Sequence, residues 1–94
     1  MARRKSRSCI IDGARLTDAA AVYRELGKGF GAPDYFGNNP DALWDLITEY
    51  GGAPVEIVWK NSAQSAARLG TAFEQIAAVL QRAEAEGRIK LRLE

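Results

Sequence analysis

The sequence places two helix-forming stretches between each pair of successive strand-forming runs. These runs, at 8–12, 55–59 and 89–93, are short and rich in β-branched or other apolar residues. Strands joined through helices pair in parallel, because a parallel pair needs a long crossover connection. The order strand, two helices, strand, two helices, strand therefore predicts an α/β fold: a three-stranded parallel sheet covered by about four helices.

The boundaries of the predicted helices come from caps, breakers and apolar periodicity. Thr17 or Asp18 caps the first helix, and the glycines at 27, 29 and 31 stop it. A second helix runs from Pro40 to about Tyr50, and two more are expected at 62–69 and 71–86. In the last strand, apolar residues alternate with charged ones, which indicates that one face of the strand is wet.

A chain of 94 residues is long enough for one domain, which we expect to span residues 8–94. Residues 1–7 hold four basic side chains and are expected to form a disordered tail. The single cysteine, Cys9, lies in an apolar run, which favours a buried structural thiol over a reactive one. No disulfide can form within the chain, and this favours a reducing compartment.

Neither an export signal nor a membrane span is expected. Only Cys9, Ile10 and Ile11 follow the basic start before Asp12, which is too short an apolar run for a signal peptide. No apolar run approaches the roughly 20 residues of a transmembrane helix. The sequence thus predicts a cytoplasmic protein with no membrane partner.

The net charge of +1 hides a segregation of charge along the chain. Between Gly31 and Trp59 there is no lysine or arginine. That block carries five carboxylates. Such an acidic block accelerates association with cationic partners.

Within that block, the segment Pro33–Asp45 combines a turn, a helix start, three aromatic residues and three carboxylates. Asn39 is a preferred N-cap, and Pro40 suits the first helical position. Such a segment holds rigid rings and acidic groups at the start of a helix, where they can anchor a cationic partner.

The helical period sorts the residues of the second helix onto two sides. Its apolar residues cluster toward the core, and its acidic residues cluster toward solvent. Trp44 falls between the two sides, beside Asp41 and Thr48, and is either a binding anchor or a tryptophan that packs on the edge of the core. The inward set is Leu43, Leu46, Ile47 and Tyr50, and the outward set is Asp41, Asp45 and Glu49.

Three features of the sequence resemble the barstar family of intracellular ribonuclease inhibitors. They are the run Pro33–Asp45, Trp59 at the end of the second strand, and the run Ala83–Gly87. The resemblance extends from Cys9 to Leu93. It implies a three-stranded parallel sheet with helices, in agreement with the order of elements above. It also implies a non-enzymatic protein that plugs the active site of a small secreted microbial ribonuclease.

The resemblance further implies roles for individual residues. Asp45 would take the place of a substrate phosphate, and Asp41 would pair with a further basic group of the nuclease. Tyr35 would lie against the catalytic histidine, and Trp44 would shield the charges. The rest of the expected contact surface is Gly37, Asn39, Thr48 and Glu49. We expect a monomer that forms a 1:1 complex with a ribonuclease, with no catalytic residue, cofactor, metal or direct nucleic-acid contact.

Two departures from the family pattern bear on the identity of the partner. Arg82 stands where the family type has a glutamate that engages the nuclease, and this reversal of charge would weaken binding to a basic enzyme. Glu49 and Tyr50 replace a small residue followed by tryptophan. The alternative is therefore an immunity or adaptor module of the same fold whose target is a non-ribonuclease toxin or another protein.

Three other functions have weaker support in the sequence. Asp41 and Asp45 could be paired catalytic carboxylates or magnesium ligands, but the chain has no histidine, and Glu49 is the only further acid nearby. The run Gly27–Gly31 follows a helix, whereas a phosphate loop links a strand to one. The basic start lacks the interleaved aromatic residues of a nucleic-acid arm.

Overall fold

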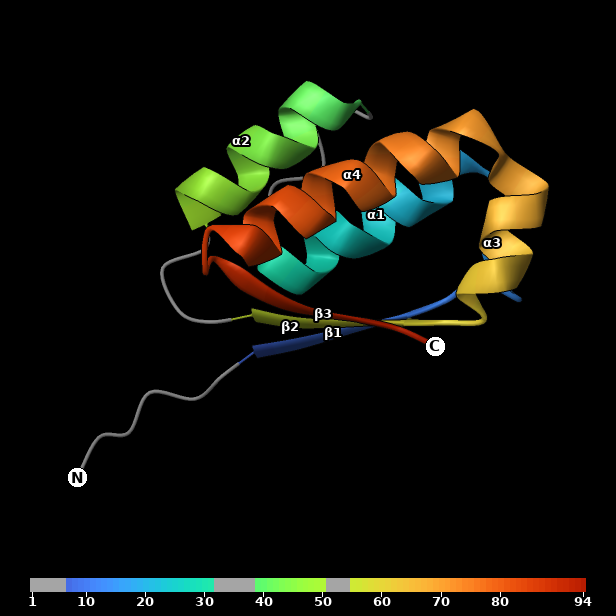
Figure 1. The fold of residues 1–94 in the computed structure, drawn as a ribbon, viewed down its shortest axis with the longest axis horizontal. Coiled ribbons are helices and arrows are strands. Elements are labelled where there is room, and N and C mark those ends of the chain that lie inside the picture. Colours follow the sequence, from blue (N-terminus) through green and yellow to red (C-terminus); the bar gives the residue numbers. More distant parts are fainter. Residues whose placement is uncertain (1–6, 32–38, 51–54) are drawn as a thin grey trace.

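The computed structural model describes residues 7–31, 39–50 and 55–94, and these form three strands and four helices. Their order matches the predicted order of elements (Figure 1). The strands are β1 (Arg7–Asp12), β2 (Val55–Lys60) and β3 (Ile89–Leu93). The helices are α1 (Ala19–Phe30), α2 (Pro40–Tyr50), α3 (Ser62–Leu69) and α4 (Thr71–Ala85).

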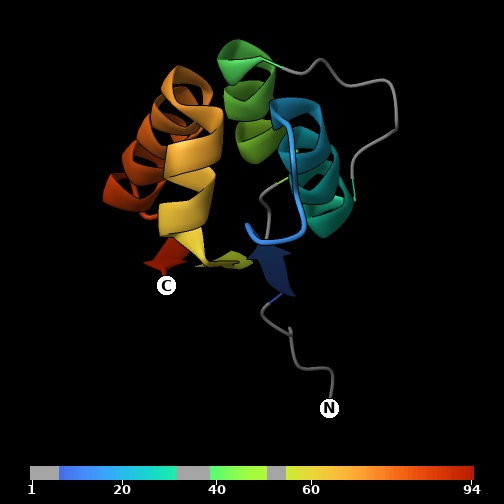
Figure 2. The same ribbon diagram turned by 90° about the vertical axis from the view of Figure 1, so that its right-hand side faces the viewer.

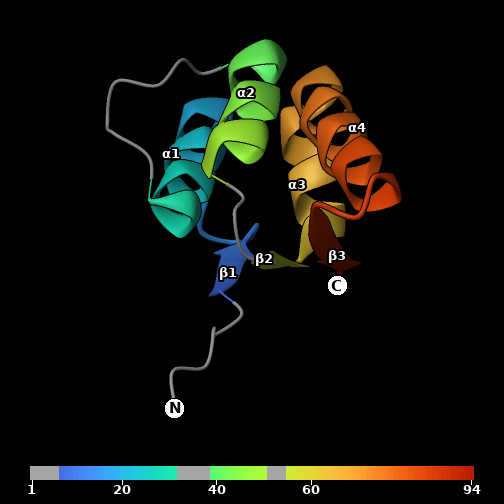
Figure 3. The same ribbon diagram turned by 90° about the vertical axis from the view of Figure 1, so that its left-hand side faces the viewer.

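The three strands form one parallel sheet in the order β1-β2-β3. Cys9 pairs with Ile57, and Ile57 pairs with Leu91. In the described part of the chain, all four helices lie on the same face of the sheet, and none of them covers the other face (Figures 2 and 3). The predicted fold class is confirmed. Strand β1 begins at Arg7, one residue earlier than the expected domain start.

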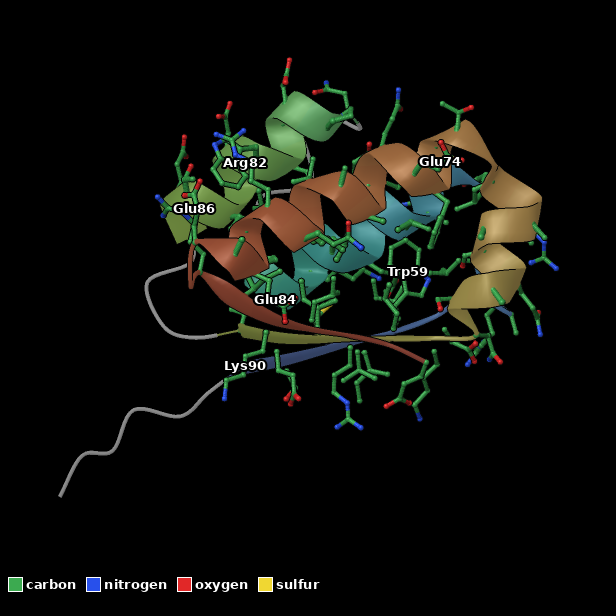
Figure 4. All side chains as sticks on the ribbon, in the orientation of Figure 1. Trp59, Glu74, Arg82, Glu84, Glu86 and Lys90 are labelled. Atoms are coloured by element: carbon green, nitrogen blue, oxygen red, sulfur yellow. The ribbon has the colours of Figure 1, made fainter. Side chains whose placement is uncertain are left out.

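The helix-covered face of the sheet supplies much of the core. Trp59 is fully buried, and its indole Nε1 donates a 3.0 Å hydrogen bond to the buried Ser65 hydroxyl (Figure 4). Its ring and the Phe73 ring make a T-shaped contact with their centroids 5.1 Å apart. This tryptophan thereby joins β2 to both α3 and α4. The buried strand residues are Cys9, Ile11, Val55, Ile57, Trp59 and Ile89.

The glycines of α1 have a different role from the one that the sequence suggested. Asp18 caps the helix as predicted, since its carboxylate accepts a 2.8 Å hydrogen bond from the Ala21 amide. The helix then continues through Gly27 and Gly29, and only Gly31, at φ 75°, ends it. A Cβ atom at Gly29 would lie 2.6 Å from the Cys9 Cβ. Gly29 therefore allows α1 to approach β1 closely, and the expectation that it stops the helix is wrong.

Helix α2 lies over α1 and α4, on their side away from the sheet (Figures 2 and 3). Leu43, Leu46 and Ile47 are buried there, as the helical period predicts. The inward position expected for Tyr50 lies outside the described side chains. On its other side, Asp41, Asp45, Thr48 and Glu49 are exposed. No helix in the described part of the chain is both long and apolar enough to cross a membrane.

Candidate functional site: the outer side of helix α2

The start of α2 is fixed by Asn39. Its side-chain Oδ1 accepts a 2.8 Å hydrogen bond from the Ala42 amide, and its carbonyl oxygen accepts one of 3.0 Å from the Leu43 amide. The first bond satisfies an amide that the first helical turn would otherwise leave unpaired, and the second is the first regular hydrogen bond of the helix. The predicted N-cap is confirmed. Its acceptor oxygen is engaged within the chain, so Asn39 positions the helix that carries the acidic residues.

Asp41, Asp45 and Glu49 are exposed on the outer side of α2. They follow one another at intervals of four residues and so form a row along the helix. None of them belongs to an ion pair with any other residue that the structure describes. We call these three residues the acidic row. With no cation from the described residues to neutralise it, the row is available to an external cation.

Trp44 lies beside the acidic row and is half-buried, packed against the core. The guanidinium carbon of Arg82 lies over its ring, 4.1 Å from the centroid, and that of Arg88 lies at 5.7 Å. These distances are within the range of cation–π contacts. One side of the tryptophan therefore packs on the protein, and an arginine from α4 covers a ring face.

Both arginines are held by one carboxylate. Glu86 binds Arg82 Nε through Oε2 at 3.5 Å and Arg88 Nε through Oε1 at 3.2 Å. Arg82 and Glu86 lie at the end of α4 that is next to α2 (Figure 4). We call Trp44, Arg82, Glu86 and Arg88 the arginine–tryptophan cluster.

Sequence reasoning singled out Arg82 for its charge but not for its contact with Trp44. Glu86 and Arg88 were missed as neighbours of the site. Two signals were present in the sequence: the intermediate helical phase of Trp44, and the i, i+4 spacing of Arg82 and Glu86. Neither signal gives the placement of α4 against α2, which depends on tertiary packing.

The remaining predicted contact residues divide into two groups. The Thr48 hydroxyl donates a 3.0 Å hydrogen bond to the Asp45 carbonyl oxygen, so Thr48 is exposed but its proton is used within the helix. Tyr35 and Gly37 lie outside the described residues. Along the described part of the chain, no group of histidine, cysteine, aspartate or glutamate side chains is arranged to hold a metal ion.

A concave region of about 360 Å³ lies beside β1 and α1, away from the acidic row, and Asp12 is among its lining residues. The Asp12 Oδ1 atom accepts hydrogen bonds of 2.8 Å from Asn61 Nδ2 and 3.0 Å from the Ala14 amide. These bonds lower the pKa of the Asp12 carboxyl group below its usual value. The carboxylate thus bonds to the turn that follows β1 and to Asn61 after β2, and this region adds nothing to the site on α2.

The fold and this surface define a small α/β protein that presents a row of carboxylates and a covered tryptophan on its outermost helix. The sequence matches the family described as "Barstar (barnase inhibitor)" over residues 6–93, and the chain belongs to this family. It is also 35% identical, over 80 residues, to a Bacillus subtilis (strain 168) protein named "Putative ribonuclease inhibitor YrdF". That alignment covers 85% of this chain and 88% of the relative.

Proposed function

We propose that this chain inhibits a small microbial ribonuclease by placing the outer side of α2 in the active site of the enzyme. The observation that carries the proposal is the acidic row, whose three carboxylates are exposed and have no ionic partner among the described residues. A ribonuclease must hold the phosphates of RNA with cationic side chains. Such a site is complementary to carboxylates fixed on a helix.

In the proposed complex, Asp45 stands in for a substrate phosphate. A carboxylate can accept two parallel hydrogen bonds from an arginine, as a phosphate can, but it offers no bond for the enzyme to cleave. Asp45 lies in the middle of the acidic row, with Asp41 and Glu49 one turn away on either side. Asp41 would pair with a further basic group, and Glu49 would border the contact.

Trp44 is the apolar part of the same contact. Its position next to Asp45 allows it to exclude water from the charge pairs, which strengthens them. Asn39 supports the surface by fixing the start of α2. Tyr35 and Gly37, from the preceding segment, and Thr48 are proposed to complete a 1:1 interface. No member of this set is proposed to act as a catalytic group.

The first test measures whether Asp45 contributes binding energy without contributing to folding. The chain is titrated into barnase and other small microbial ribonucleases, and RNA cleavage and the heat of binding are followed. We expect inhibition, and we expect Asp45→Ala to weaken binding by more than about 2 kcal/mol, as for a central interface residue. The melting temperature should change little, because Asp45 is exposed and has no ionic partner among the described residues.

Glu56→Ala is the matched control for this experiment. Glu56 belongs to the same acidic block of the sequence, but it pairs in register with Lys90 and alternates with the buried residues of β2. It therefore lies on the sheet face that none of the four described helices covers. Failure to inhibit any of the nucleases, together with recovery of a partner of another class, would favour the immunity or adaptor alternative.

A further inference from the structure

We propose that Arg82 selects the partner of this chain, by binding a carboxylate of the nuclease that borders its phosphate-binding site. This inference rests on the proposed function, because it places Arg82 at the border of the same interface. The nuclease would then carry charges of both signs around its active site: a cationic centre opposite the acidic row and an acidic group opposite Arg82. A nuclease with a basic group at that point would be disfavoured.

The first support is that the Arg82 guanidinium group has two contacts within the chain. The group lies 4.1 Å from the centroid of Trp44, and its Nε faces a Glu86 oxygen at 3.5 Å. Arg88 holds the other oxygen of the same carboxylate at 3.2 Å. Two contacts in different directions restrict the rotation of a long side chain. Less conformational entropy is then lost when a partner binds it.

The second support is the part of the guanidinium group that remains available. Among the described residues, the ion pair of Arg82 with Glu86 is made through Nε, its two terminal nitrogens form no hydrogen bond, and its side chain is 65% exposed. These terminal nitrogens carry donors in the plane of the group, with the spacing that suits the two oxygens of a carboxylate. A guanidinium group stacked on an aromatic ring retains those in-plane donors.

The third support is the distribution of charge around Trp44. On its α2 side lie the three carboxylates of the acidic row. On its α4 side, Arg82 and Arg88 share the single carboxylate of Glu86, which leaves an excess of one positive charge in the arginine–tryptophan cluster. The charge of the surface therefore changes from negative to positive across Trp44. A partner that matched only the acidic row would face like charge at Arg82, and this discriminates among nucleases.

The test compares Arg82→Glu and Arg82→Gln with the unaltered chain, using barnase and a set of barnase variants. In each variant, one lysine or arginine at the border of the active-site cleft is replaced by glutamate. We expect at least one of these variants to bind the unaltered chain about tenfold more tightly than barnase does. The same variant should lose that advantage with Arg82→Glu, and Arg82→Gln should give an intermediate affinity.

Lys90→Glu is the matched control, because it changes the net charge equally from the uncovered face of the sheet (Figure 4). It should not alter the ranking of the variants. Melting curves establish that each altered chain is folded. Suppose that the chain inhibits a nuclease, but that each barnase variant binds the unaltered chain, Arg82→Glu and Arg82→Gln with equal affinity. The proposal that Arg82 selects the partner is then wrong, and the proposed function stands. If no form binds any nuclease, both proposals are wrong.

Discussion

At the scale of single residues, the thiol of Cys9 lies where α1 packs against β1, opposite Gly29. Its Sγ donates a 3.7 Å hydrogen bond to the Glu25 carbonyl oxygen. Burial, with a smaller effect from the Glu25 charge, raises the pKa of Cys9 from 9.0 to about 11. The folded protein thus favours the neutral thiol, and ionisation opposes folding.

This shift predicts a loss of stability in alkaline solution. The contribution of Cys9 is fully present below pH 9.0, the ordinary thiol value, and is lost as the pH rises through about 11. Over that window, the free energy of unfolding should lose up to about 2 to 3 kcal/mol through Cys9. Denaturant unfolding of the unaltered chain and of Cys9→Ala, measured from pH 7 to 11, tests this. The stability advantage of the unaltered chain should narrow above pH 9, whereas parallel curves would contradict it.

At the scale of elements, the N-cap at Asn39 fixes where α2 begins, and so fixes the position of the acidic row. Asn39→Ala removes the acceptor for the Ala42 amide and should cost about 0.5 to 2 kcal/mol of stability. Asn39→Asp keeps an acceptor and adds a negative charge at the positive end of the helix, so it should restore most of the loss. Thermal and urea unfolding of the three chains measure this. An equal loss in both variants would show that the amide group has another role.

The same scale separates what the sequence could predict from what it could not. The period of α2 sorts Leu43 and Ile47 inward and Asp45 outward without any knowledge of the fold, because the helix geometry alone sets the phase. The end of α1 was harder to predict from the sequence, because Gly29 allows a close contact with Cys9, a residue distant in sequence. Arg82 was predicted to face the partner, but its contact with Trp44 depends on how α4 packs beside α2. The local sequence pattern predicts local structure, whereas contacts between elements can be known only once the packing of those elements is known.

At the scale of the whole molecule, the net charge is close to zero, but the charged side chains are distributed unevenly over the surface. The location of a charge should therefore influence binding more than the net charge does. Glu49 and Glu56 belong to one acidic block of the sequence, yet the fold sends them to opposite faces. Glu49 continues the acidic row, and Glu56 lies on the uncovered face of the sheet. If the acidic row steers a cationic nuclease, only the first of these charges should influence the rate of encounter.

This difference gives a kinetic prediction for the complex with an inhibited ribonuclease. Raising the salt from about 0.1 M to about 1 M shortens the screening length from about 10 Å to about 3 Å, so association should slow by roughly tenfold or more. Dissociation should change less, because short-range contacts control it. Glu49→Gln should lower the association rate and its dependence on salt, and Glu56→Gln should alter neither. Stopped-flow measurements on the three chains provide the comparison. Equal effects of the two substitutions would mean that net charge, and not the acidic row, guides the encounter.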